Sequence, residues 1–111
     1  MSIDQRKVVD AIGIERATGD VSLTISDHLD WSDVPGHAFA LQEKINDYLA
    51  FLESGEIFTE YPAAKGKKMR IQIFFLHAPP AGDALRFLAH AEEVIRKAGF
   101  GLVYRVHEEE A

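Results

Sequence analysis

The side chains best suited to chemistry gather in one short segment of this chain. Three carboxylates, two imidazoles and the only tryptophan lie between residues 27 and 37, and these are Asp27, His28, Asp30, Trp31, Asp33 and His37. Carboxylate and imidazole groups are ligands of zinc, manganese and iron, and imidazole titrates near neutral pH. The segment is therefore a candidate metal or acid–base site, with Asp27, His28, Asp30 and His37 as its possible ligands.

The same residues also have an ordinary structural interpretation. Their spacing matches no established metal motif, and Asp and Ser are frequent before helices because they cap exposed backbone N–H groups. In a catalytic site, His28 or His37 would be the general base and Asp27 or Asp30 would orient it. Trp31 would stack on a ligand in a binding site, or simply pack over the end of the core. We expect capping and turn formation to explain most of the group, and no particular cofactor is implied.

The hydropathy pattern indicates which elements hold this segment. A β-branched apolar run, a turn at residues 17–20 and strict alternation after that turn predict a β-hairpin. Apolar residues three and four apart predict two amphipathic helices. The first helix is expected between Asp33 and Gly55, and the second between a cap at Asp83 and Gly99. Residues 56–68 are expected to form a loop. The strands are expected over 8–15, 21–26, 69–77 and 102–106.

This order, ββαβαβ, predicts an α+β fold. A strand, a helix and a strand in succession form a parallel pair, so the sheet of four strands should be mixed. Two helices cover only one face of such a sheet, which predicts a two-layer sandwich with one open face. Phe74, Leu76 and Val103 would lie on the open face among polar side chains, and a second copy of the chain would cover them. They are the predicted interface residues of a homodimer.

Composition and charge limit the kinds of partner and site that this protein can have. The chain has 111 residues, no cysteine and a formal net charge of -6. The charge disfavours nucleic acid and anionic membranes as partners, and the lack of cysteine excludes disulfides and thiolate metal sites. The charged N-terminus is unlike a signal peptide and no segment is apolar enough to span a membrane, so we expect a cytoplasmic protein. We expect a flexible N-terminus (1–7), a single domain (8–107) and an acidic tail (108–111).

Four segments carry a resemblance to a known family. They are Val9-Asp10-Ala11-Ile12-Gly13-Ile14, Leu23-Thr24-Ile25-Ser26-Asp27-His28-Leu29-Asp30-Trp31, Leu41-Gln42-Glu43-Lys44-Ile45-Asn46 and Tyr48-Leu49-Ala50-Phe51-Leu52-Glu53-Ser54-Gly55. Together they resemble a family of small, functionally uncharacterised bacterial proteins of about this length, with a Ser-Asp-His-Leu-Asp-Trp core. The resemblance extends from about Val8 to Val106. It implies a free-standing bacterial domain and transfers no catalytic residues.

Two hypotheses about function follow. The first is a non-catalytic interaction module, a homodimer, that binds an unknown protein or small-molecule partner through its open sheet face or the loop after the second strand. The second is a small metal-dependent or acid–base enzyme centred on Asp27, His28, Asp30 and His37. The first ranks higher mainly because ordinary helix capping accounts for most of the polar segment.

Overall fold

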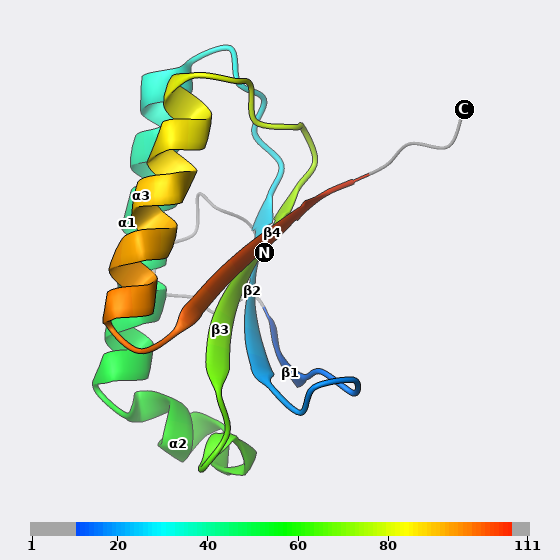
Figure 1. Cartoon of the computed structure of the whole chain (residues 1–111), viewed down its shortest axis with the longest axis vertical. Coiled ribbons are helices and arrows are strands. Elements are labelled where there is room, and N and C mark those ends of the chain that lie inside the picture. The colour runs from blue at the N-terminus through cyan, green and yellow to red at the C-terminus, as the bar shows by residue number, and fades with distance from the viewer. Residues whose placement is uncertain (1–10, 108–111) are drawn as a thin grey trace.

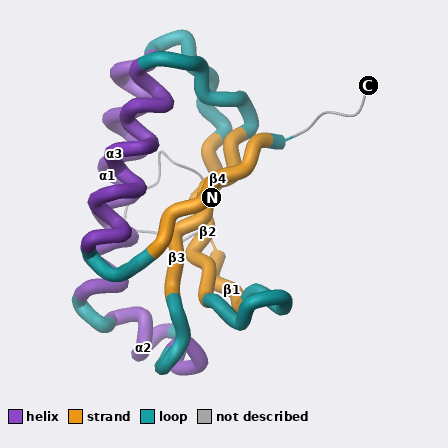
Figure 2. Tube along the Cα trace, in the orientation of Figure 1, coloured by secondary structure: helices purple, strands orange, loops and turns teal. Residues whose placement is uncertain are grey.

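Helices lie along one face of a four-stranded sheet in the computed structural model, which describes residues 11–107 (Figure 1). The strands are β1 (Ala11–Ile14), β2 (Val21–Asp27), β3 (Met69–Phe75) and β4 (Gly101–Val106). The helices are α1 (Val34–Glu53), α2 (Glu56–Glu60) and α3 (Asp83–Lys97), with a short 3-10 helix η1 (Pro62–Ala64). The two long helices stand on the same side of the strands, so the predicted α+β two-layer fold is confirmed (Figure 2).

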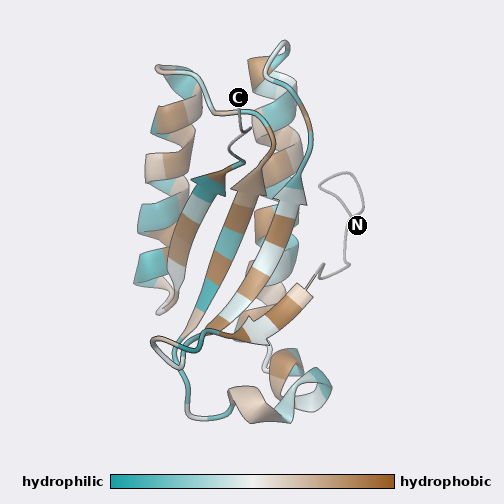
Figure 3. Cartoon of the chain, turned by 90° about the vertical axis from the view of Figure 1, so that its right-hand side faces the viewer, coloured by the Kyte–Doolittle hydropathy of each residue, from teal (hydrophilic) through white to brown (hydrophobic). Residues whose placement is uncertain are grey.

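The sheet is mixed, as predicted, and its strands follow the order β1-β2-β3-β4. β1 pairs with β2 antiparallel, whereas β2 with β3 and β3 with β4 are parallel. This order places the hairpin at one edge and β4 at the other, a point that the sequence leaves open. The three parallel strands therefore end at the same end of the sheet (Figure 3).

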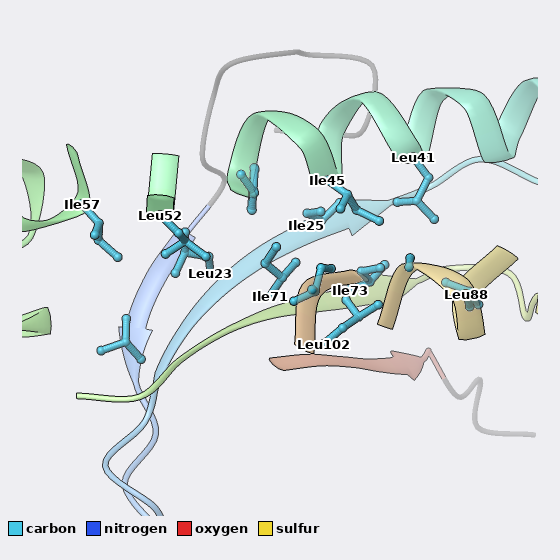
Figure 4. Close-up of a cluster of buried hydrophobic side chains, with 14 of the residues drawn as sticks. Leu23, Ile25, Leu41, Ile45, Leu52, Ile57, Ile71, Ile73, Leu88 and Leu102 are labelled. Carbon is cyan, nitrogen blue, oxygen red and sulfur yellow. The ribbon is translucent and has the colours of Figure 1, made fainter. Parts of the chain in front are cut away.

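The core fills the space between the sheet and the helices. Strand residues two apart share a face, and the odd-numbered residues of β2 and β3 point towards the helices. Helix α1 contributes Leu41, Ile45 and Leu52, and α3 contributes Leu88 (Figure 4). Ile95 of α3 belongs to the same cluster. The strand residues of this buried cluster are Val21, Leu23, Ile25, Ile71, Ile73, Phe75 and Leu102. No helix in the range 11–107 is long and apolar enough to cross a membrane.

The structure corrects two local predictions. Residues 56–68 were expected to be a loop, but they contain α2 and η1. Gly55 ends the long helix in the left-handed region (φ 81°), and the fully buried side chain of Ile57 fixes the next turn against the core. Helix α3 is capped by Gly82, with Asp83 as its first residue. The predicted flexible N-terminus (1–7), the start of the first strand and the acidic tail lie outside the described residues.

The predicted helix start at Asp33 is confirmed in atomic detail. The Asp33 carboxylate accepts a hydrogen bond from the Gly36 N–H at 3.1 Å, and Pro35 lies in the first turn, where no N–H is needed. A Cβ atom added at Gly36 would lie 2.2 Å from the Asp33 Oδ2 atom. A side chain at this position would therefore force the Asp33 carboxylate to move from its present capping position.

Replacing Gly36 with alanine should consequently destabilise the protein, although alanine normally favours a helix. We expect Gly36→Ala to lower the free energy of unfolding by about 1 kcal/mol, the usual value of a lost cap, in urea denaturation. In an Asp33→Ala background the same change should be neutral or stabilising. An equal loss in both backgrounds would contradict this explanation.

Candidate functional site

The candidate site is built on a buried contact between β2 and α1. Asp27 is the last residue of β2 and lies on its helix-facing side, and His37 lies in the first turn of α1. The Asp27 Oδ2 and His37 Nε2 atoms are 2.5 Å apart, and both side chains are buried. The other carboxylate oxygen of Asp27 accepts a hydrogen bond from the Leu29 N–H at 3.1 Å. The pair therefore ties the end of a strand to the start of a helix.

The hydrogen bonds fix where the protons of this pair lie. The His37 Nδ1 atom is 2.9 Å from the Asp30 carbonyl oxygen, which can only accept, so Nδ1 carries a hydrogen. The Nε2 contact with Asp27 then needs one more proton, placed either on the imidazole or on the carboxyl group. In both cases neither ring nitrogen is left to act on a substrate. The pair is thus built as a structural brace.

Trp31 covers this pair. Its ring stacks on the His37 ring with centroids 3.7 Å apart and an angle of 18° between the planes. Its Nε1–H donates to the His77 carbonyl oxygen at 3.0 Å, which ties it to the loop after β3. The ring also lies 5.9 Å from that of Phe75 in the core. Trp31 therefore packs over the end of the core, the simpler of its two sequence-based interpretations.

The remaining predicted site residues do not join the pair through their side chains. The Asp30 carboxylate accepts hydrogen bonds from the N–H and the hydroxyl of Ser32, and these bonds lower the pKa of Asp30. His28 is exposed and lies on the other side of the sheet from His37. Among residues 11–107, no three His, Asp or Glu side chains converge to hold a metal ion.

A groove lies on the open face at the carboxyl ends of the parallel strands. Its volume is about 490 Å³, and the side chains that line it form two rows across the sheet. Ser26, Phe74 and Arg105 are cross-strand partners in the first row. Two residues further along the chain, directly after the ends of β2, β3 and β4, the second row is lined by His28, Leu76 and His107. We call this hollow, defined by these six residues, the open-face groove.

The groove combines apolar and basic chemistry. Its middle column is Phe74 on β3 and Leu76 just beyond the end of that strand, which are 42% and 45% exposed. The flanking columns carry the Arg105 guanidinium and the imidazoles of His28 and His107. These basic groups contrast with the net charge of -6 of the chain. Such a surface suits a ligand that has both an apolar part and an acidic group.

Sequence reasoning gave no binding role to two members of this groove, Arg105 and His107, although alternation along the last strand places Arg105 on the open face. The signal was present, because a histidine follows each parallel strand, at His28, His77 and His107. Without the strand order, however, nothing placed these strand ends side by side. His77 contributes its backbone carbonyl to Trp31, and the other two histidines line the groove. The predicted interface residues Phe74, Leu76 and Val103 are all exposed on the open face.

Removing the His37 side chain should lower the stability of the protein far more than removing the exposed side chain of His28. His37→Leu leaves the buried Asp27 carboxylate without its partner, and we expect the free energy of unfolding to fall by about 3 kcal/mol. Adding Asp27→Asn should recover part of this loss, because an amide is easier to bury than a carboxylate. The control, His28→Leu, should change stability by less than about 0.5 kcal/mol. If the losses of unfolding free energy of His37→Leu and Asp27→Asn simply add in the double variant, measured by urea denaturation, the two residues are not coupled.

The pH dependence of stability offers a separate check. Burial raises the pKa of Asp27 above its ordinary value of 3.8, against the opposing effect of His37. Between 3.8 and the raised pKa, the folded chain holds a proton that the unfolded chain has lost. Stability should therefore fall as the pH rises through this window, and Asp27→Asn should flatten that slope. Identical slopes for the two proteins in thermal unfolding would contradict the burial effect.

Comparison with known proteins places the chain in a family. The model of a "Family of unknown function (DUF6572)" matches residues 1–108, which is nearly the whole sequence. No curated protein and no solved structure matches the chain. The match agrees with the resemblance found in the sequence. The chain belongs to the family of unknown function DUF6572.

Proposed function

We propose that this chain is a non-catalytic interaction module that binds an amphipathic carboxylate in the open-face groove. The observation that carries the proposal is the arrangement of the groove, in which an apolar column at the end of β3 lies between basic groups at the ends of β2 and β4. The carboxyl ends of parallel strands are a common place for ligands in open sheets. A ligand lying along this column would bury its apolar part on Phe74 and Leu76 and direct its carboxylate to Arg105.

The state of the Asp27–His37 pair favours binding over catalysis. A general base needs a nitrogen that can reach a substrate proton, whereas both nitrogens of His37 are already hydrogen-bonded inside the protein. The imidazoles that face the groove, His28 and His107, lie on the two outer columns with Leu76 between them. They are placed to attract an acidic group rather than to form an acid–base dyad with each other.

The proposal includes self-association and a place in the cell. Exposed apolar residues occur beyond the groove as well, among them Val103, Tyr104 and Leu85, and a second copy would cover part of them.

We also place the module in the bacterial cytoplasm. The chain has no cysteine that could form a disulfide in an oxidising compartment, and it resembles a bacterial family.

Titration with octanoate, followed by ¹H–¹⁵N NMR spectroscopy, tests the binding function. We expect shift changes at the ends of β2, β3 and β4, and weaker or no changes with octylammonium, which has the opposite charge. Arg105→Gln should weaken octanoate binding about tenfold, because it removes a charge-assisted hydrogen bond. Arg86→Gln, an exposed arginine on α3, is the matched control and should bind like the unaltered protein.

The outcome that would overturn the proposal is equally specific. Equal binding of octanoate and octylammonium would mean that the basic groups do not select the ligand. Shift changes confined to residues outside the groove would place binding elsewhere.

A further inference from the structure

One buried polar side chain on the open face of the sheet has no partner in the described part of the chain. Gln72 lies on β3, and strand alternation places it on the side away from the helices. Its side chain is only 7% exposed. The amide can both donate and accept hydrogen bonds, yet none joins it to another residue of the range 11–107. Most polar side-chain atoms buried to this extent are hydrogen-bonded, so this exception calls for an explanation.

Gln72 borders the open-face groove. Figure 3 looks onto this face, with the helices behind the sheet. The row of Thr24, Gln72 and Val103 comes directly before the first row of the groove, which contains Phe74 and Arg105. Neighbouring strands lie about 4.8 Å apart and residues two apart on a strand about 6.6 Å apart, which places the Cα atoms of Gln72 and Arg105 about 8 Å from each other. Both long side chains can therefore contact one small head group.

Two arginines lie near Gln72, and only one of them is available to a ligand. Arg70 donates from Nε to the Ser22 hydroxyl at 2.8 Å and from Nη2 to the Glu15 carboxylate at 3.2 Å, so its guanidinium is already used. The Arg105 guanidinium is exposed and makes no hydrogen bond or ion pair with the described residues. Arg105 is therefore the cation that would share a ligand with Gln72.

We propose that Gln72 and Arg105 together bind the head group of the ligand, and that this head group carries a hydroxyl beside its carboxylate, as in an amphipathic 2-hydroxy acid. This inference rests on the proposed function and defines its class of ligand more narrowly. The Arg105 guanidinium and the Gln72 NH2 group would both donate to the carboxylate. The Gln72 carbonyl oxygen can only accept, so it needs a donor from the ligand. A hydroxyl on the carbon next to the carboxylate supplies that donor.

The buried amide is what makes such a site selective. A simple fatty acid offers the carbonyl oxygen of Gln72 no donor, whereas a 2-hydroxy acid satisfies both halves of the amide. A site with a buried polar group discriminates against ligands that lack the matching group, because that group then stays unpaired. The alkyl chain of either acid would lie over Phe74 and Leu76, so the two ligands differ only at the head group.

Isothermal titration calorimetry with octanoate and with each enantiomer of 2-hydroxyoctanoate tests this inference. We expect one enantiomer to bind about tenfold more tightly than octanoate. Gln72→Met keeps the length of the side chain and removes the amide, so it should bind the two acids with nearly equal affinity. Gln42→Met is the matched control, because the Gln42 amide donates to Asn46 at 2.8 Å on α1, and it should keep the preference.

The stability of Gln72→Met separates a binding role from a structural one. Because the amide has no protein partner to lose, we expect the free energy of unfolding in urea to stay unchanged or to rise. A clear fall would mean that the amide stabilises the sheet, and it would overturn the inference. The side-chain ¹⁵N–H signals of Gln72 should also shift more with 2-hydroxyoctanoate than with octanoate.

The binding results distinguish this inference from the proposed function. Equal binding of octanoate and 2-hydroxyoctanoate, or a preference that survives in Gln72→Met, would overturn the role of Gln72 and leave the carboxylate-binding groove intact. If neither acid binds, the proposed function fails and this inference fails with it.

Discussion

The hydrogen bond between Asp27 and His37 is the constraint that holds together the end of the molecule where the parallel strands β2, β3 and β4 finish. It is a buried polar contact at the edge of the apolar core, and it joins the end of β2 to the first turn of α1. The Asp30 carbonyl, the Leu29 N–H and the Trp31 ring complete it, so every residue from 27 to 31 except His28 has a bonded or stacked place around it. These contacts fix the loop that follows β2.

This fixed loop shapes the neighbouring surface. Because Asp27 is held on the helix side, the adjacent residues Ser26 and His28 face the open side, where the groove lies. Trp31 reaches the loop after β3 through the His77 carbonyl, so the ends of two parallel strands are tied together. The polar residues of this segment thus have two different roles. The buried Asp27 and His37 hold the ends of the strands in place, whereas the exposed His28 lines the groove.

Most of the fold could be predicted from the sequence, because it rests on local periodicity. The alternation in β2 and the apolar spacing in α1 and α3 gave the elements and the single covered face. Helix α2 escaped prediction because it is only five residues long and is held by the burial of Ile57 rather than by its own periodicity. The strand order also escaped, since it depends on contacts between distant segments.

The candidate site could be predicted only in part, for the same physical reason. Sequence proximity grouped Asp27 with His28, but adjacent strand residues face opposite sides of the sheet. The partner of Asp27 is His37, ten residues along the chain and one helical turn inside α1. Arg105 lies on β4, His107 directly follows that strand, and only the parallel register brings them beside His28 and Phe74.

The most direct test of this account is the protonation state of His37, measured from the ¹⁵N shifts of its imidazole nitrogens. The account predicts that Nδ1 carries a hydrogen bonded to the Asp30 carbonyl and that Nε2 shares a proton with Asp27, with slow exchange at both positions. An imidazole with a free nitrogen in rapid exchange with water would contradict it. That result would make His37 available as a base and would favour the acid–base enzyme over the interaction module.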